Sequence, residues 1–147
     1  MTVELVAKDV ASLVNNHIPE AVVSCTETDL LVKLDHLGPV AKFLKQEPSL
    51  DFSFLIGITA VDYVEYFELI YHLRSMKLNQ SMVLKARAFG RDEPVVPSLV
   101  ELWPGADLQE REIWDLMGIK FDAHPNLKRI LLWEGFSGHP LRKDYLG

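Results

Sequence analysis

The chain has 147 residues, 48% hydrophobic and 24% charged, which suits one ordinary globular domain and excludes wholesale disorder. Its formal net charge of −6 argues against a nucleic-acid-binding protein, because such proteins normally carry a basic excess. The single cysteine, Cys25, excludes a disulfide within the chain and a site built from four thiolates, such as a standard iron–sulfur cluster. We expect Cys25 to be a buried, small hydrophobic side chain because it lies in an apolar, strand-like stretch. No apolar run approaches the roughly 20 residues that a membrane-spanning helix needs.

The first third of the chain predicts one helix followed by two short strands. Apolar residues at spacings of three and four predict a helix with one buried stripe, which Pro19 ends. Residues 21–25 and 30–34 predict two strands joined by a polar turn. Apolar side chains in the second strand alternate with Lys33 and Asp35, so we expect one wet face. The helical stripe consists of Val3, Val6, Val10, Leu13 and Val14.

The middle of the chain predicts a second helix and three longer strands. The helix is expected to begin at about Pro39, a residue suited to the first helical position, and to end at Pro48. Each strand alternates with period two and is rich in β-branched or aromatic residues. The side chains expected on the inner faces are Val40, Phe43 and Leu44 of the helix; Phe52, Phe54, Ile56 and Ile58; Phe67, Leu69, Tyr71 and Leu73; and Met82, Leu84, Ala86 and Ala88.

This order of elements predicts an α+β fold, a two-layer sandwich with the order α-β-β-α-β-β-β and helices on one face of a mixed or antiparallel sheet. We expect residues 1–90 to form this core domain. Residues 91–147 are expected to add a proline-rich linker, a short helix and an extended, irregular C-terminal arm.

The last third of the chain has a different character from the predicted core. Three prolines break up residues 91–105, which we therefore interpret as an extended linker over the surface. A short helix follows, with Asp107 as its expected N-cap and Gly118 as the left-handed residue after its end. From Ile119 onward no regular element is predicted, so this segment must gain its order from something it packs against. Three tryptophans and several arginines, residue types enriched at binding hot spots, favour a docking arm.

Two His-Pro pairs, His124-Pro125 and His139-Pro140, invite a metal-binding or acid–base interpretation, with Asp115, Asp122 or Asp144 as carboxylates. Their spacing matches no recognised pattern of metal ligands. The other interpretation is that the two imidazoles bond backbone carbonyls and so hold an irregular arm. A small stand-alone metal-dependent enzyme that uses both histidines and a carboxylate is thus one alternative function.

The short helix carries the charged run Glu110-Arg111-Glu112 and then Asp115. Arg111 and Asp115 lie four residues apart, so they can form an ion pair on one helix face. Without further information such a face is interpreted as a solvated surface. By the same reasoning residues 142–145 form a frayed chain end.

An ordered set of short motifs runs through this region. It consists of Glu110-Arg111-Glu112, Asp115, Gly118-Ile119, His124-Pro125, Leu127, Arg129-Ile130-Leu131, and residues 138–145, which read Gly-His-Pro-Leu-Arg-Lys-Asp-Tyr. Residues 58–63 and 71–75 add two earlier pieces. Together they resemble the C subunit of bacterial NADH:quinone oxidoreductase (respiratory complex I), the thirty-kilodalton subunit of mitochondria. The chain departs from that pattern at Ala123, where the family usually has glycine, and at Asn126, where it has an acidic residue.

The resemblance implies a non-catalytic, structural role in the peripheral arm of the complex, on the cytoplasmic side of the membrane. It implies docking on the D-type (quinone-site) and B-type (iron–sulfur) subunits. The chain is expected to hold no cofactor, with iron–sulfur clusters, FMN and quinone in the partner subunits. Homologous subunits of group-four membrane-bound hydrogenases and F420-type dehydrogenase complexes are the alternative. The partner contacts implied are Glu110, Arg111, Glu112, Asp115, His124, Pro125, Arg129, His139, Pro140, Leu141, Arg142, Lys143, Asp144 and Tyr145.

Overall fold

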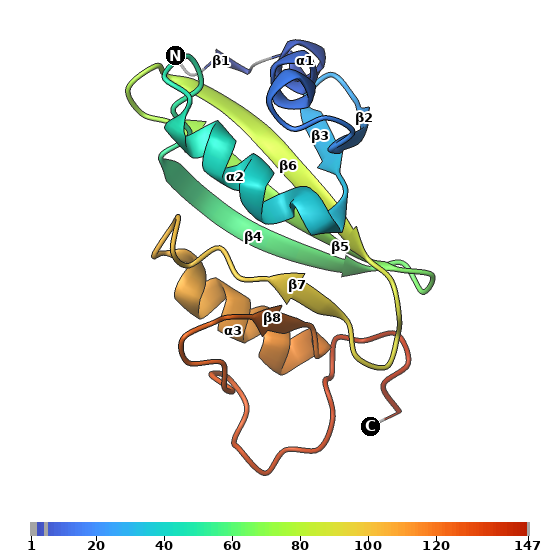
Figure 1. The fold of residues 1–147 in the computed structure, drawn as a ribbon. Helices are drawn as coiled ribbons and strands as arrows, with labels where there is room; N and C mark the ends of the chain where they lie inside the picture. Colours follow the sequence, from blue (N-terminus) through green and yellow to red (C-terminus); the bar gives the residue numbers. More distant parts are fainter. Residues whose placement is uncertain (1–2, 5, 147) are drawn as a thin grey trace.

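A mixed β-sheet is the centre of the structure, a computed structural model that describes residues 3–4 and 6–146 (Figure 1). Its main strands lie in the order β2-β3-β6-β5-β4. Strands β4, β5 and β6 pair antiparallel, whereas β3 and the short β1 (Val3–Glu4) pair parallel with β6. The main strands are β2 (Val22–Cys25), β3 (Asp29–Val32), β4 (Phe54–Asp62), β5 (Phe67–Ser75) and β6 (Gln80–Ala88).

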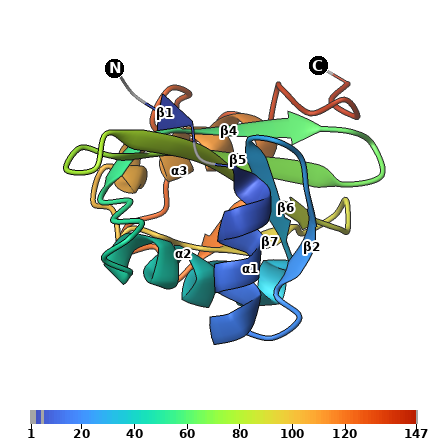
Figure 2. The same cartoon turned by 90° about the horizontal axis from the view of Figure 1, so that it is seen from above.

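Helices α1 (Ala7–His17) and α2 (Leu37–Gln46) cover one face of this sheet, as Figure 2 shows from above. Between helix and sheet lie the alternate side chains of β5 and β6, which are buried as the period-two pattern predicts. The predicted two-layer α+β fold is therefore confirmed. The buried strand residues are Phe67, Leu69, Tyr71 and Leu73 in β5 and Met82, Leu84, Ala86 and Ala88 in β6.

The N-terminal helix is shorter than its apolar stripe predicts. It begins at Ala7, because Val3 lies instead in β1, and its buried face includes two alanines that allow a close approach to the sheet. Val6 and Leu13 of the predicted stripe are 56% and 41% exposed. Helix α2 begins two residues before Pro39, because the 3-10 turn η1 (Leu34–His36) leads directly into it.

The predictions for β2, β3 and β4 each need a correction. Cys25 is exposed, because β2 is an edge strand with mostly exposed side chains. Lys33 and Asp35 are exposed as predicted, but β3 ends at Val32, before both of them, and Leu30, Leu31 and Val32 are all buried. The side chains of β4 that were predicted to face the core do not all do so. Phe52 is buried ahead of the strand, but a register shift between Leu55 and Gly57 leaves Phe54 and Ile56 about half exposed.

The segment after Gly90 belongs to the folded body, so the prediction of a surface linker was wrong. Strand β7 (Val95–Pro97) pairs parallel with β8 (Lys120–Asp122), which also corrects the expectation of no regular element after Ile119. Val96 and Trp103 are buried in the main core, and the Trp103 indole N–H donates to the carbonyl of Phe52 at 3.0 Å. The proline of β7 is tolerated because both strands of this small sheet are edge strands.

Helix α3 (Ala106–Met117) lies beside the edge strand β4 (Figure 1). Its N-cap is Gly105 rather than the predicted Asp107, and no side chain caps it. Its end is as predicted, because Gly118 adopts a left-handed φ of 73°. Gln109 bridges helix and strand, since its side-chain oxygen accepts the Ile58 N–H at 2.7 Å. None of the helices in the described part of the chain is long and apolar enough to cross a bilayer.

Candidate docking site in the C-terminal tail

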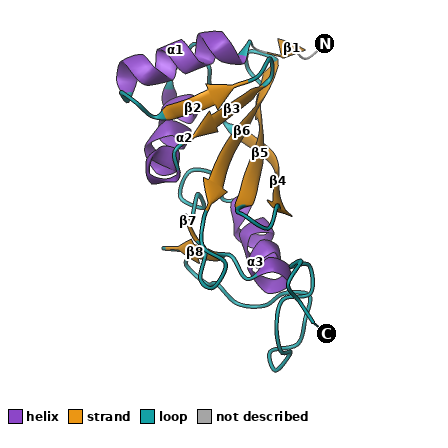
Figure 3. Ribbon diagram, turned by 90° about the vertical axis from the view of Figure 1, so that its right-hand side faces the viewer, coloured by secondary structure: helices purple, strands orange, loops and turns teal. Residues whose placement is uncertain are grey.

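Residues 123–146, the C-terminal tail, wrap around the end of α3 and return toward β4 without forming a helix or strand (Figure 3). Most of the ordered motifs noted in the sequence lie in this tail or on α3. Because repeating backbone hydrogen bonds are absent from the tail, side chains must hold its polar backbone groups in place.

The Asp115 carboxylate, fully buried on α3, organises the first part of the tail. One oxygen accepts the backbone N–H groups of Ile130, Leu131 and Leu132 at 3.2, 2.7 and 2.9 Å. The other accepts a 2.7 Å bond from the guanidinium of Arg129. Burial raises the pKa of Asp115, but these four bonds outweigh it and bring the pKa to about 2. Asp115 is therefore ionised at neutral pH and fixes the tail to the helix.

Arg129 extends this attachment to a more distant part of the tail. Besides the Asp115 side chain, its guanidinium bonds the Asp115 carbonyl at 2.9 Å. The same group donates to the carbonyls of Phe136 at 2.9 Å and Gly138 at 2.8 Å. Its planar fork of donors suits such multiple acceptors. Asp115 and Arg129 together therefore fix both ends of the loop between residues 129 and 138.

The two imidazoles of the His-Pro pairs bond backbone carbonyls, which confirms that interpretation of the sequence. His139 Nδ1 lies 2.9 Å from the Asp115 carbonyl, and its ring lies against Gly118. A Cβ added at Gly118 would come within 2.7 Å of the His139 ring, so this position requires glycine for space as well as for backbone angle.

His124 is held in the same way at the other end of α3. Its Nδ1 accepts the Asn126 N–H at 2.9 Å, so Nε2 carries the proton. Nε2 lies 3.2 Å from the Asp107 carbonyl and 3.0 Å from the Asp107 carboxylate. In residues 3–4 and 6–146, no group of three or more His, Cys, Asp or Glu side chains is placed to hold a metal ion.

A second buried carboxylate, Asp62 at the end of β4, holds the last part of the tail. It is 4% exposed and pairs with both terminal nitrogens of Arg91. It also accepts the backbone N–H groups of Val64 at 2.8 Å and Lys143 at 2.9 Å. The bonds from Arg91 outweigh burial and, with the two backbone bonds, hold the pKa of Asp62 well below its usual range. Sequence reasoning gave Asp62 no such role.

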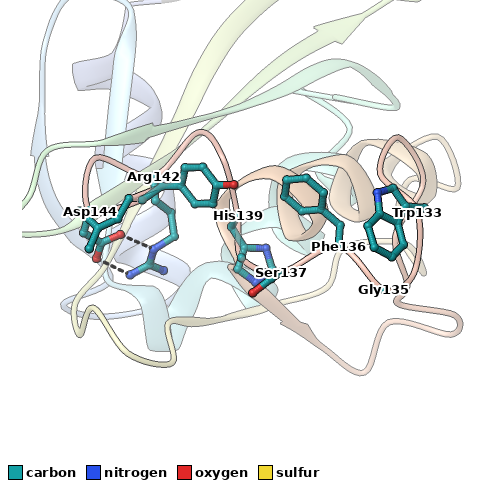
Figure 4. Close-up of a pocket in the computed structure, with 10 residues that line it drawn as sticks. Trp133, Gly135, Phe136, Ser137, His139, Arg142 and Asp144 are labelled. Carbon is teal, nitrogen blue, oxygen red and sulfur yellow. Dashed lines mark hydrogen bonds and ion pairs between the residues drawn. The ribbon is translucent and has the colours of Figure 1, made fainter.

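Arg142 completes this attachment, so residues 142–145 are not a frayed end. Its guanidinium makes two bonds to Asp144, at 2.8 and 2.9 Å (Figure 4). It also donates to the carbonyls of Met117, at 3.3 Å, and Arg91. Asp144 in turn lies 3.1 Å from the guanidinium of Arg91. The hydrogen bonds from Arg142 are the main reason why the pKa of Asp144 lies below its usual range.

The charged run on α3 divides between interior and surface. Glu110 is fully buried and accepts bonds from the Ser98 hydroxyl at 2.6 Å and the Leu99 N–H at 2.9 Å. Burial raises the pKa of Glu110 despite these bonds. The predicted Arg111–Asp115 pair is absent, because Asp115 binds Arg129. Arg111 instead donates to backbone carbonyls of the tail.

The outer side of the tail is apolar. Leu131, Trp133 and Leu141 are 62%, 70% and 60% exposed. Trp133 also lines an open hollow of about 680 Å³, together with Phe136 and Tyr145 among others. Figure 4 shows Trp133 and Phe136 at one end of this hollow and the Arg142–Asp144 pair at the other. Large apolar side chains of the tail are thus exposed, although the backbone that carries them is held by buried charged groups.

This arrangement can be compared with known proteins. Residues 30–147 match the family described as respiratory-chain NADH dehydrogenase, 30 Kd subunit. The chain belongs to this family. Its members are subunits of an oxidoreductase complex, so the resemblance noted in the sequence is confirmed.

Individual relatives agree with the family. The chain is 40% identical over 144 residues to the C subunit of NADH-quinone oxidoreductase from Hyphomonas neptunium, with 93% of this chain and 70% of the relative covered. It is 48% identical over 118 residues to the C subunit of the same enzyme from Moorella thermoacetica, covering 79% of this chain and 78% of the relative. A chain in the structure of the membrane-bound sulfane sulfur reductase, an archaeal respiratory membrane complex, shares the fold. Its TM-score is 0.76 at 24% identity, with 95% of this chain and 85% of that chain covered.

The residues that the family resemblance implies as partner contacts fall into two groups in the structure. The exposed group is Glu112, Pro125, Leu141, Lys143 and Asp144. The buried or partly buried group is Glu110, Arg111, Asp115, His124, Arg129, His139, Pro140, Arg142 and Tyr145. Most members of the second group bond to the chain's own backbone or to its charged side chains.

Ala123, one of the two departures from the motif pattern noted in the sequence, has an unusual backbone conformation. Ala123 has a φ of 65°, in the left-handed region that favours glycine. Glycine, which the resemblance implies for this position, adopts that conformation without the clash that a Cβ introduces.

Proposed function

We propose that the chain is a non-catalytic assembly subunit in the peripheral arm of a complex I-type NADH:quinone oxidoreductase. In this proposal the C-terminal tail docks on the D-type and B-type subunits. Iron–sulfur clusters, FMN and quinone are bound by those and other partner subunits. The chain itself is a peripheral component on the cytoplasmic side of the membrane, retained there by its partners.

The observation that carries the proposal is the set of exposed apolar side chains on an ordered tail. Leu131, Trp133 and Leu141 extend from backbone that the bonds of Asp115 and Asp62 hold in place. A partner that covers these side chains gains apolar burial, and a tail already in one conformation loses little further entropy on binding. Large aromatic side chains in such settings commonly dominate binding energy.

This view assigns different roles to the two groups of signature residues. Exposed residues such as Leu141 and Lys143 make contact with the partner. Buried residues such as Asp115 and Arg129 position the tail and do not touch the partner. Replacement of a contact residue should therefore weaken assembly without unfolding the chain, whereas replacement of a positioning residue should change both.

The test is a double substitution, Trp133→Ala with Leu141→Ser, introduced into the chain within its native complex. The complex is purified from membranes through a tag on the D-type subunit, and the amount of chain retained is measured after dilution. We expect retention to fall at least about fivefold, the loss typical of removing a hot spot. The melting temperature of the isolated variant should stay unchanged, because both side chains are largely exposed.

The matched control is Met76→Ser, which removes a side chain that is 63% exposed at the β5–β6 turn, far from the tail. This control should be retained at the wild-type level. Full retention of the double variant would overturn the proposal. So would quinone reduction by the isolated, purified chain, since it would place catalytic residues in the chain itself.

A further inference from the structure

We infer that Phe67, the first residue of β5, is a positioning residue for the docking tail. Its ring holds the guanidinium groups of Arg91 and Arg142 in place, and through them one wall of the hollow in the tail. Phe67 is buried and does not touch the partner. The inference rests on the proposed function and deepens it, because it names a residue outside the tail and outside the motifs on which docking depends.

The Phe67 ring contacts both arginines that hold the end of the tail. The central guanidinium carbons of Arg91 and Arg142 lie over this ring, 4.9 and 5.1 Å from its centroid. Asp62 is directly opposite Phe67 in the pairing of β4 with β5, so the two side chains lie on the same face of the sheet. The ring and the Asp62 carboxylate therefore meet the same Arg91 guanidinium.

The charges of this cluster are balanced within the chain. Arg91 binds the Asp62 carboxylate at 2.9 Å and lies 3.1 Å from that of Asp144. Arg142 binds Asp144 at 2.8 and 2.9 Å. These hydrogen bonds act through the N–H groups, in the plane of each guanidinium, whereas an aromatic ring acts on its flat face. Phe67 thus supplies a constraint on the two arginines that their hydrogen bonds do not.

The setting favours a strong interaction between the ring and the two cations. The Phe67 ring is fully buried, and the side chains of Arg91 and Arg142 are only 27% and 12% exposed. The attraction between a cation and the negative face of an aromatic ring increases when water is excluded from both. An aliphatic side chain at position 67 would fill the same core space without offering such a face.

The position of Arg142 matters for docking because this residue lines the hollow. Arg142 and Asp144 form one end of the hollow, and Trp133 lies at the other end (Figure 4). Trp133 follows backbone that Asp115 holds, at residues 130–132, so the two ends are attached to the body at separate points. A shift of Arg142 on Phe67 would therefore change the shape of the hollow that a partner has to fit.

The first test weakens the negative face of the ring while keeping its shape and apolar character. Mono-, di- and trifluorophenylalanine are placed at position 67, and amide hydrogen exchange of the full chain is measured. Exchange at residues 142–145 should become faster with each fluorine, reaching about threefold to tenfold for the trifluoro variant. Residues 130–132, which Asp115 holds, should exchange as in the wild type.

The matched control is the same series at Phe52. This side chain is also fully buried, and in the described part of the chain no guanidinium lies over its ring. Fluorination there should leave exchange at residues 142–145 unchanged. A flat series at position 67, or an equal response from position 52, would overturn the inference, because Phe67 would then only fill space in the core.

The second test measures retention of the fluorinated chain in the native complex. Trifluorophenylalanine at position 67 should lower retention about threefold, with a smaller loss for the monofluoro variant. Wild-type retention of this variant, combined with loss of Trp133→Ala/Leu141→Ser, would refute the role of Phe67 and leave the proposed function standing. Wild-type retention of both variants would instead refute the proposed function.

Discussion

In the body of the protein the most buried side chains are apolar, such as Leu69 and Tyr71 of β5. The tail is instead held by two buried carboxylates of the body, Asp115 on α3 and Asp62 on β4. Both regions have a defined conformation. The body is stabilised by burial of apolar side chains, whereas the tail is held by hydrogen bonds between its backbone and a few buried charged side chains. A segment ordered in the second way does not need its own apolar side chains for folding. Trp133 and Leu131 are thereby left at the surface.

The largest effect is expected in the body. Leu69→Ala removes a fully buried side chain and leaves a cavity, which should lower the free energy of unfolding by about 3 kcal/mol. Urea denaturation followed by circular dichroism measures this loss, and Met76→Ala, at an exposed position, should change it by less than about 0.5 kcal/mol. A loss below about 1 kcal/mol for Leu69→Ala would mean that the body is packed loosely, and that apolar packing does not distinguish the body from the tail.

The next effect is local to the tail. Asp115→Asn leaves Arg129 without its charge partner and weakens three backbone bonds, so the tail should open more easily by about 2 kcal/mol. Amide hydrogen exchange at residues 130–132 should become about thirtyfold faster, with β5 still protected. Glu112→Gln, an exposed carboxylate on the same helix, is the control. Equal loss of protection in β5 would show that tail and body unfold together.

A smaller effect is expected from pH. The pKa of Asp115 is about 2 in the folded chain and 3.8 ordinarily, so the unfolded chain binds the proton more tightly. The stability that the charge supplies is fully present above about pH 5 and is lost as pH falls toward about 2. Between about pH 5 and pH 3 the loss from this group amounts to about 1 kcal/mol. Stability measured across this range should fall less steeply for Asp115→Asn, and identical slopes would refute the assignment.

The smallest effect is a gain. Ala123→Gly relieves a left-handed alanine but gives the unfolded chain more freedom, so a net stabilisation of about 0.5 kcal/mol is expected. Hydrogen exchange at residues 123–127 should slow slightly. Ala60→Gly, within β4, should destabilise instead, and a loss of stability from both variants would show that Ala123 carries no strain.

These contrasts also explain which features sequence patterns predict. The inner faces of β5 and β6 and the end of α3 at Gly118 follow from periodicity and from the backbone preference of glycine, both local properties. Strands β7 and β8 are only three residues each and pair between segments far apart in the chain, so no periodic pattern marks them. The partner of Asp115 was missed for a related reason. The local candidate, Arg111, is four residues away, whereas the true partner, Arg129, is distant in sequence.

The Gln109 side chain on the edge of the main sheet has a consequence for solubility. Strand β4 is the last strand of the sheet, and its free backbone groups are of the kind that recruit strands from other molecules. The bond from the Ile58 N–H to Gln109 occupies one of these groups, and the irregularity at Leu55/Gly57 interrupts the row of donors beside it. Both features lower the tendency of β4 to pair with strands of other molecules and so to start fibrils along this edge.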